Sequence, residues 1–386
     1  MTLPATGLPT VKVEARPTRR VAHLTSVHSA ADVRIFGKEC RSLAEAGYEV
    51  VLIAPHDKAE VVDGIRIEPV KRNGSRRQRM TVTVMDVWRK AMASRAEVYH
   101  FHDPELLPVG VLLKVAGKHV IYDAHENLAK DILTKQWMNA SLRRLVSNGT
   151  AAFEHCSCHV FDAIVAATPA IASLFPPTKT VLVQNYPRSD ELLSKTSVPF
   201  SKRDPAVLYL GGIEPLKGAR EMVAAMARVP ARLQARLLLL GNITPPALAE
   251  ELTDSPGWQS ARHLGFQDRS AVAKITSNVQ AGLVLFHPAP NYDDSQPNKL
   301  FEYMSAGLPV IASHFPHWHE LIDRTGCGLT VDPLNPDQIA RAITWILDNP
   351  EQAEAMGRRG QAAVRSTYNW NTQEEKLLML YRGILQ

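Results

Sequence analysis

Two acids in the last third of the chain, Asp294 and Glu302, have a spacing that suits the binding of sugar hydroxyls. Pro297 between them is suited to a first helical position, so we expect a helix to begin between Ser295 and Asn298. Asp294 would then lie in the loop before the helix, and Glu302 about two turns inside it. A carboxylate accepts two hydrogen bonds side by side, which matches the vicinal hydroxyls of a ribose or hexose. A capping acid followed by a surface acid is the structural alternative.

A glycine-rich turn earlier in the chain could bind phosphate. In "VLYLGGIEPLKGAREMV", Gly211 and Gly212 follow a predicted strand, and Lys217-Gly218 opens a predicted helix. Glycines let backbone amides approach a phosphate, and the N-terminus of a helix favours negative charge. Lys217 would add a point charge. The pattern is neither G-x-G-x-x-G nor a Walker A loop, so a simple tight turn is the alternative.

Further candidates follow strands in the first half. "YDAHEN" places His125 after a strand, where a side chain facing a cleft is expected, with Glu126 as a weaker candidate for handling an acceptor. "VHSAADVRIF" places Asp32 and Arg34 in a strand-to-helix loop. A histidine held by nearby backbone is the alternative for His125.

Two stretches look like metal motifs, but we expect structural roles for both. In "HFHDPE" we expect His100 and His102, which precede Asp103, to point to opposite faces of their strand. "EHCSCH" lies in a helical pattern, where positions two apart do not share a face, and zinc sites usually separate paired cysteines by about two to four residues. Its candidate ligands are Glu154, His155, Cys156, Cys158 and His159. We therefore predict no metal.

The stretch "KRNGSRRQRM" carries cations without acids and interrupts the regular pattern. Its charged residues are Lys71, Arg72, Arg76, Arg77 and Arg79. A solvated loop is one interpretation. The other is a patch over residues 71–79 that contacts anionic lipid or a diphosphate-linked acceptor. Aromatic residues for base stacking are not interleaved, so we expect no nucleic acid partner.

Composition indicates an ordinary globular protein of two domains. The 386 residues exceed what one core usually holds, and 45% are apolar and 22% charged. The four cysteines form no disulfide framework, the N-terminus shows no apolar signal region, and no apolar run approaches the roughly 18 residues of a membrane span. These features predict a cytoplasmic protein. The net charge of +5 permits an anionic ligand or surface without choosing among them.

Apolar strand-like runs alternate with amphipathic helical ones in both halves of the chain. This rhythm predicts βαβ units, parallel sheets and an α/β class, with ligands at the carboxyl ends of the strands. Polar and proline-containing residues from Tyr186 to Pro205 read as a linker. We expect an N-terminal domain over 1–190, a C-terminal domain over 200–369, and a closing helix over 370–386.

Read together, "QPNKLFEYMSAGLPVIAS", "LGGIEPLKG", "VYHFHDPELLP" and "VIYDAHE" resemble the retaining glycosyltransferases of group 1 (family 4). The resemblance implies the GT-B fold, two Rossmann-like domains facing a central cleft, with the nucleotide-sugar mainly on the C-terminal one. It also implies that the C-terminal helix packs back on the N-terminal domain.

The resemblance assigns roles to individual residues. Glu302 would bind the ribose and Asp294 the donor sugar, Lys217 would bind the diphosphate, and His125 would lie beside the sugar. The remaining donor contacts would come from Gly211, Gly212, Gln296, Pro297, Asn298 and Lys299.

Two positions depart from the family's pattern. The first acid is Asp rather than Glu, so Asp293 competes with Asp294 for the sugar. Gly212 stands where the family often has an arginine, and we suggest Arg34 as its substitute.

The predicted activity is transfer of a hexose from a nucleoside diphosphate sugar, with uridine diphosphate as the family's usual nucleotide, to a hydroxyl of a sugar or lipid-linked sugar. Such enzymes serve polysaccharide or glycoconjugate biosynthesis. We expect no metal or other cofactor, and a cytoplasmic location that includes the inner face of the membrane. A sugar-nucleotide epimerase of the same fold and a catalytically silent sugar-nucleotide binding protein are the alternatives.

Overall fold

The structure is a computed structural model, and it describes residues 19–71, 75, 78–133, 138–188, 198–290, 292 and 295–386. The predicted sugar-binding acids Asp293 and Asp294 lie outside the described residues, as do three cations of the basic stretch, Arg72, Arg76 and Arg77. Within the described part of the chain, every helix is too short or too polar to cross a membrane.

The first sheet has eight strands in the order β3-β4-β2-β1-β5-β6-β7-β8. The pairs β1–β2, β1–β5, β2–β4, β5–β6 and β7–β8 are parallel, and β3–β4 at one edge is antiparallel. The strands are β1 (Arg20–Leu24), β2 (Glu49–Pro55), β3 (Glu60–Val62), β4 (Ile65–Val70), β5 (Val98–Phe101), β6 (His119–Ala124), β7 (Ala163–Ala166) and β8 (Thr180–Leu182).

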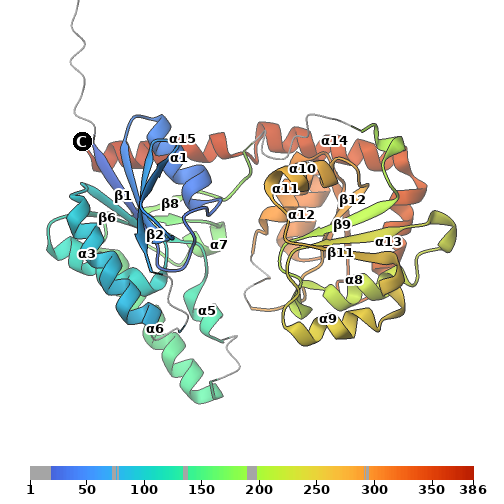
Figure 1. The fold of residues 1–386 in the computed structure, drawn as a ribbon, viewed down its shortest axis with the longest axis horizontal. Coiled ribbons are helices and arrows are strands. Elements are labelled where there is room, and N and C mark those ends of the chain that lie inside the picture. Colours follow the sequence, from blue (N-terminus) through green and yellow to red (C-terminus); the bar gives the residue numbers. More distant parts are fainter. Residues whose placement is uncertain are drawn as a thin grey trace, which may run out of the picture. The chain divides into compact units, whose positions relative to one another are not determined.

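The second sheet has six strands in the order β11-β10-β9-β12-β13-β14, with parallel pairs throughout (Figure 1). Its strands are β9 (Ala206–Leu210), β10 (Arg236–Leu240), β11 (Ala261–Gly265), β12 (Ala281–Val284), β13 (Val310–Ser313) and β14 (Gly328–Val331). The predicted α/β class with two parallel-sheet domains is confirmed.

Helices connect the strands in both sheets. Those of the first half are α1 (Arg41–Glu45), α3 (Val84–Ser94), α4 (Leu107–Val115), α5 (Leu128–Leu133), α6 (Ala140–Val160) and α7 (Pro169–Ala172), with π-helical turns η1 (Ile35–Cys40) and η2 (Arg79–Thr83). Those of the second half are α8 (Ala219–Met226), α9 (Pro246–Thr253), α10 (Arg269–Thr276), α11 (Asn298–Ser305), α12 (Pro316–Thr325), α13 (Pro336–Asp348), α14 (Pro350–Ser366) and α15 (Trp370–Ile384).

The second sheet is covered on both faces because its central strands β9, β12 and β13 are almost continuous apolar runs. On β9, Val207 and Tyr209 join a core with α8, α9 and α13, whereas Ala206 and Leu208 join another with α10, α11 and α12 (Figure 1). Successive strand residues point to opposite faces, so a continuous apolar run places apolar side chains on both faces of the sheet, and helices bury both faces. Each fully buried large apolar side chain contributes about 1.5–3 kcal/mol. This packing holds the strand ends and helix starts that carry the candidate site.

The C-terminal helix α15 packs on β8, the last strand of the first sheet. Gln373 accepts a hydrogen bond from the backbone N–H of Gln184 at 3.0 Å, and Lys376 Nζ donates to the carbonyl oxygen of Leu182 at 3.3 Å. Leu377 and Tyr381 of the helix are fully buried. The helix therefore contacts the first sheet through Gln373 and Lys376, at the end of β8.

By its internal contacts the chain divides into two compact units, Met1–Tyr122 and Asp123–Gln386. The domain bounds of 1–190 and 200–369 stay a prediction.

Candidate active site

The glycine-rich turn follows β9 as predicted. Gly211 has a φ of 115°, a region that side chains other than hydrogen rarely allow. A short 3-10 turn, η5 (Pro215–Lys217), then leads to Gly218, the N-cap of α8, with a φ of 74°. A Cβ on Gly218 would collide with the Leu285 carbonyl oxygen at the end of β12. These two glycines let the turn fold tightly over the carboxyl end of the sheet.

Lys217 lies at this turn with a partly exposed side chain. Its Nζ is 2.8 Å from Oε1 of Glu214, which is part of the same turn. A Cβ on Gly212 would lie 2.9 Å from that carboxylate oxygen and 3.5 Å from the lysine nitrogen. The missing side chain at Gly212 therefore gives Lys217 its place beside the backbone.

A second lysine, Lys299, reaches the same turn from α11. Its Nζ donates to the Tyr209 hydroxyl at 2.7 Å and lies 3.9 Å from the centroid of that ring. A Cβ on Gly211 would lie only 3.2 Å from this nitrogen. Burial and the positive charge of Lys217 lower the pKa of Lys299 to about 7, against the opposing effect of Glu302 and Glu214. Two lysines thus meet at the turn, where a bound anion would stabilise the charged form of Lys299.

The helix that carries Lys299 is fixed by its other face. Leu300, Phe301, Tyr303 and Met304 are buried, and the Tyr303 hydroxyl accepts the Leu210 N–H at 2.8 Å. Pro297 is the N-cap and Asn298 the first helical residue, which confirms a helix start between Ser295 and Asn298. The N-terminus of α11 therefore lies beside the glycine turn, and the Lys299 amine contacts that turn.

Glu302 is mostly buried and forms an ion pair. Its Oε1 lies 2.8 Å from a terminal nitrogen of Arg269, the first residue of α10. Ahead of the helix, the Gln296 Oε1 accepts a hydrogen bond from Gln184 Nε2 at 2.6 Å. The ribose role of Glu302 stays a prediction, in which the hydroxyls would share this carboxylate with Arg269.

Sequence profiles of two families match the chain over most of its length. The family described as glycosyl transferases group 1 matches residues 190–363, and the glycosyl transferase 4-like domain matches residues 33–185. The chain belongs to the group 1 glycosyltransferases. The first match spans the glycine turn, both lysines and Glu302 of this glycosyltransferase.

Known proteins agree with this assignment. A D-inositol 3-phosphate glycosyltransferase of Segniliparus rotundus is 26% identical over 226 residues, which cover 57% of this chain and 49% of that protein. The chain thus spans about half the length of this relative. The sucrose-phosphate synthase of Thermosynechococcus elongatus has a similar fold, with a TM-score of 0.76, 19% identity and coverage of 95% and 99% of the two chains. The Anabaena protein HepE, in complex with UDP and glucose, gives a TM-score of 0.71 at 14% identity, covering 95% and 100%. These solved structures confirm the GT-B type of fold.

The predicted substrate-binding residues of the N-terminal half of this glycosyltransferase contact neighbouring acids or backbone amides. His125 follows β6, and its Nδ1 lies 3.7 Å from Oδ1 of the fully buried Asp123. Arg34 is buried, and its Nε is 3.0 Å from Oε1 of Glu39, so a phosphate would compete with that carboxylate. Asp32 accepts the backbone N–H groups of residues 34 and 35, both at 2.9 Å. The substrate roles of His125 and Arg34 stay predictions.

The expectation that His100 and His102 point apart was wrong. Residues two apart on a strand share a face, and the two ring centroids lie 4.8 Å apart. Both rings meet His23 and Glu39 in one buried group. The neighbouring Asp103 has a structural role, since its Oδ2 accepts the Thr25 hydroxyl at 2.8 Å and the Ser26 N–H at 2.6 Å.

The stretch 154–159 lies within α6 and is not among the potential metal-binding groups found in the described residues. Cys156 is exposed, whereas Cys158 is buried. Burial raises the pKa of the Cys158 thiol to about 12, with Glu154 adding to the shift, and this disfavours the thiolate that a metal needs.

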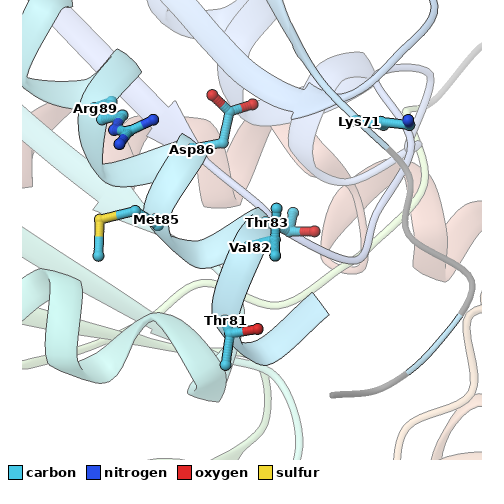
Figure 2. A pocket seen from close by; sticks show the side chains of 7 residues that line it. All are labelled: Lys71, Thr81, Val82, Thr83, Met85, Asp86 and Arg89. Atoms are coloured by element: carbon cyan, nitrogen blue, oxygen red, sulfur yellow. The ribbon is translucent and has the colours of Figure 1, made fainter. Parts of the chain in front are cut away.

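The described part of the basic stretch borders a pocket of about 440 Å³ on η2 and α3 (Figure 2). Figure 2 shows Lys71 at one side of this pocket and Arg89 and Met85 at the other, with Val82, Thr83 and Asp86 between them. Val82 is 58% exposed and Met85 53%. Cations and exposed apolar side chains therefore occur together on this surface.

Three side chains of the donor-side site were missed by the sequence analysis. Glu214 could have been found, because it stands three residues before Lys217, where side chains meet on a helical turn. Tyr209 and Arg269 offered no signal, because they meet Lys299 and Glu302 only after strands and helices distant in the sequence have packed.

Proposed function

We propose that the protein transfers a hexose from a nucleoside diphosphate sugar to a hydroxyl acceptor, with retention at the anomeric carbon. The observation that carries the proposal is the position of Lys299 beside Gly211 and of Lys217 beside the next residue, Gly212, with Lys299 on the first turn of α11. Two lysines, the first amides of a helix and two consecutive glycines, which let a ligand approach the backbone, together provide a site for a diphosphate. We propose that Lys299 supplies the positive charge that the family often takes from an arginine at the position of Gly212, because its Nζ lies beside the backbone of the turn.

The donor would be held at both ends of its diphosphate. Glu302 would accept hydrogen bonds from the ribose, as its carboxylate is already positioned by Arg269. Asp294 and the amides before α11 would hold the sugar. Uridine diphosphate is the nucleotide we propose, since HepE, which shares the fold, is seen with UDP and glucose.

The reaction needs charge stabilisation on the leaving diphosphate more than a protein nucleophile. The bond between the anomeric carbon and the phosphate oxygen breaks, and the acceptor oxygen forms its bond on the same face. The departing phosphate takes the acceptor proton. Lys217 and Lys299 stabilise the charge that develops on the phosphate, which lowers the barrier because this charge grows toward the transition state. His125 would orient the sugar through a hydroxyl.

For the acceptor we propose a sugar or polyol hydroxyl on a phosphorylated or lipid-linked molecule. The Segniliparus relative is named for D-inositol 3-phosphate. The surface around Lys71, Arg89 and Met85 would contact an anionic membrane, because exposed apolar side chains insert among headgroups while cations attract them. Sedimentation with vesicles rich in phosphatidylglycerol, and not with phosphatidylcholine alone, is the expected result. Met85→Asp should weaken it.

A donor panel followed by product analysis tests the function. A nucleotide sugar at 100 times its dissociation constant should stabilise the protein by about 2.7 kcal/mol in thermal unfolding. The stabilising donor, incubated with candidate acceptors, should give a glycoside of unchanged anomeric configuration by NMR. Interconversion of the donor sugar without an acceptor would identify an epimerase instead. Binding without any turnover across the panel would support a silent binding protein.

A further inference from the structure

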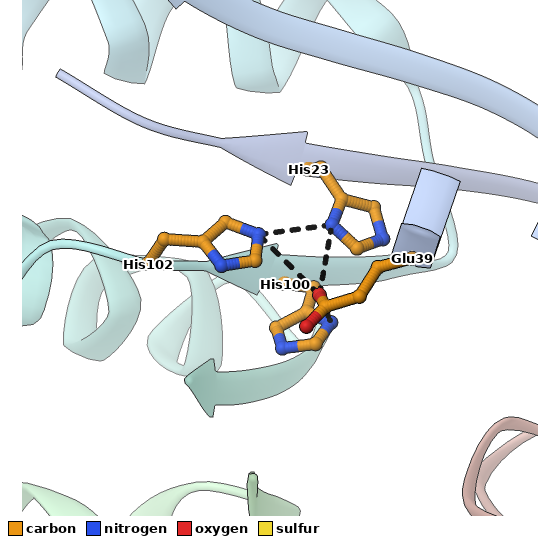
Figure 3. Close-up of side chains that lie close together, drawn as sticks. All are labelled: His23, Glu39, His100 and His102. Atoms are coloured by element: carbon orange, nitrogen blue, oxygen red, sulfur yellow. Dashed lines mark hydrogen bonds and ion pairs between the residues drawn. The ribbon is translucent and has the colours of Figure 1, made fainter. Parts of the chain in front are cut away.

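A buried group of three histidines and a glutamate lies in the first unit, on β1, β5 and η1. His23 is on β1, His100 is on β5, His102 follows β5, and Glu39 is on η1. Each of the four residues is fully buried, with 0% exposure. Figure 3 shows the rings and the carboxylate converging on one point from these separate elements.

The sheet topology explains why these side chains meet. β1 and β5 are parallel neighbours, and their register pairs His23 directly with His100. His102 lies two residues further along, so its ring is on the same face. Glu39 then reaches the rings from the helical turn that covers this face. Three chain segments therefore bring four potential metal ligands to a single position: β1 supplies one histidine, β5 and the residue after it supply two, and η1 supplies the glutamate.

The distances suit a tetrahedral metal site. One ligand atom from each residue lies within 4.8 Å of all the others. His23 Nδ1 is 3.0 Å from His102 Nε2, and Glu39 Oε2 is 3.9 Å from His23 Nδ1, His100 Nδ1 and His102 Nε2. Zinc bonds of about 2.0–2.1 Å place tetrahedral ligands roughly 3.4 Å apart. The observed separations bracket that value, so small side-chain rotations would complete the coordination.

The chemistry of the ligands also favours a metal. Neutral imidazole and carboxylate are the ligands that Zn²⁺ takes from histidine and glutamate. Glu39 Oε1 lies 3.0 Å from Arg34 Nε, while Oε2 faces the histidines. In metal sites the ligands are typically oriented by a hydrogen-bonding partner outside the coordination sphere, and Arg34 would orient the Glu39 carboxylate in this way.

We propose that His23, Glu39, His100 and His102 bind one divalent metal ion of the zinc class, in a structural site. The ion would join η1 to the two central strands β1 and β5, and through Arg34 it would hold the loop that precedes η1. Because the four ligands have no exposed surface, the ion would enter as the unit folds and leave only when it unfolds.

Metal analysis of the full chain tests the proposal. The protein is produced without a metal-affinity step, dialysed against EDTA and analysed by plasma mass spectrometry, which should find about one zinc per chain. It is also unfolded, stripped, and refolded with Zn²⁺, with Co²⁺ or with EDTA. Refolding with Co²⁺ should give the visible absorption bands of tetrahedral cobalt, and refolding with EDTA should lower the melting temperature.

Two variants and two controls locate the site. Glu39→Gln and His23→Asn should each lose most of the bound metal and the cobalt bands. His56→Asn, a partly exposed histidine of the same unit, and Cys156→Ser, in the other histidine- and cysteine-containing stretch, should keep both. If a site variant does not fold, the cobalt spectrum of the wild-type chain decides.

The proposal is overturned if the wild-type chain holds well under about 0.1 metal per chain after refolding with Zn²⁺ and shows no tetrahedral cobalt bands. It is equally overturned if folded Glu39→Gln and His23→Asn retain the full metal content. In either case the four side chains form a hydrogen-bonded structural network only.

Discussion

Lys299 should make donor binding depend on pH. Burial and the charge of Lys217 lower its pKa to about 7, so in the free protein this amine is largely neutral above that pH. A bound diphosphate would favour the charged form and raise the pKa again. Donor binding above pH 7 therefore requires uptake of a proton, and affinity should fall as the pH rises.

The size of this change in donor affinity follows from the change in the pKa of Lys299 when the donor binds. If the donor restores an ordinary lysine pKa, the affinity at pH 9 should be about a hundredfold lower than below pH 7, since each pKa unit is worth about 1.36 kcal/mol. A nucleotide sugar is the appropriate ligand, because its diphosphate is esterified at both ends and does not titrate in this range.

The lowered pKa of Lys299 also makes the stability of the folded protein depend on pH. The unfolded chain binds the proton between pH 7 and 10.5 and the folded one does not, so this lysine makes the ligand-free protein more stable as pH rises through that window.

The assay is isothermal titration of the best donor from pH 6.5 to 9.5, in buffers of different ionisation enthalpy to count protons. Lys299→Met should remove the pH slope and the proton uptake, while Lys274→Met, an exposed lysine on α10, should keep both. A wild-type affinity that changes less than twofold over this range, or a Lys299→Met protein with the same slope, would refute the role of Lys299.

Other predictions address the rest of the site and the fold. Glu302→Ala should weaken donor binding by about 1.5–3 kcal/mol through the lost ribose hydrogen bonds, and an unchanged dissociation constant in the folded variant would exclude that contact. Lys217→Ala should lower kcat more than the melting temperature; wild-type turnover and affinity would leave it as a turn residue only. Activity should survive EDTA added to the folded protein, and loss restored only by a divalent ion would show a catalytic metal. Deleting the residues after Thr372 removes the hydrogen bonds of Gln373 and Lys376 at the end of β8, and the buried side chains of Leu377 and Tyr381, and should lower both the melting temperature and the activity; an unaltered truncated protein would show that α15 is dispensable.

Much of the fold could be predicted because the signals are local. The apolar runs that become β9, β12 and β13 are short, continuous and bounded by glycine, proline or polar residues. Pro297 marked the start of α11 to within two residues. The edge pair β3–β4 was not predicted, since its strands are short and one of them alternates in burial rather than forming a buried run. A wrong assumption about residues two apart on a strand concealed the histidine cluster.

The sequence by itself determined the α/β class, the glycine turn, the two lysines and the helix that begins after Pro297, because backbone preference and hydrophobic period act over a few neighbouring residues. Which charges meet was decided only by the tertiary structure. Lys299 and Lys217 come together because β9 and β12 are neighbours in the sheet although they are distant in the chain. His23 meets His100 for the same reason on β1 and β5. Strand order joins such residues, and it depends on how whole elements bury their apolar faces, which no short stretch of sequence encodes.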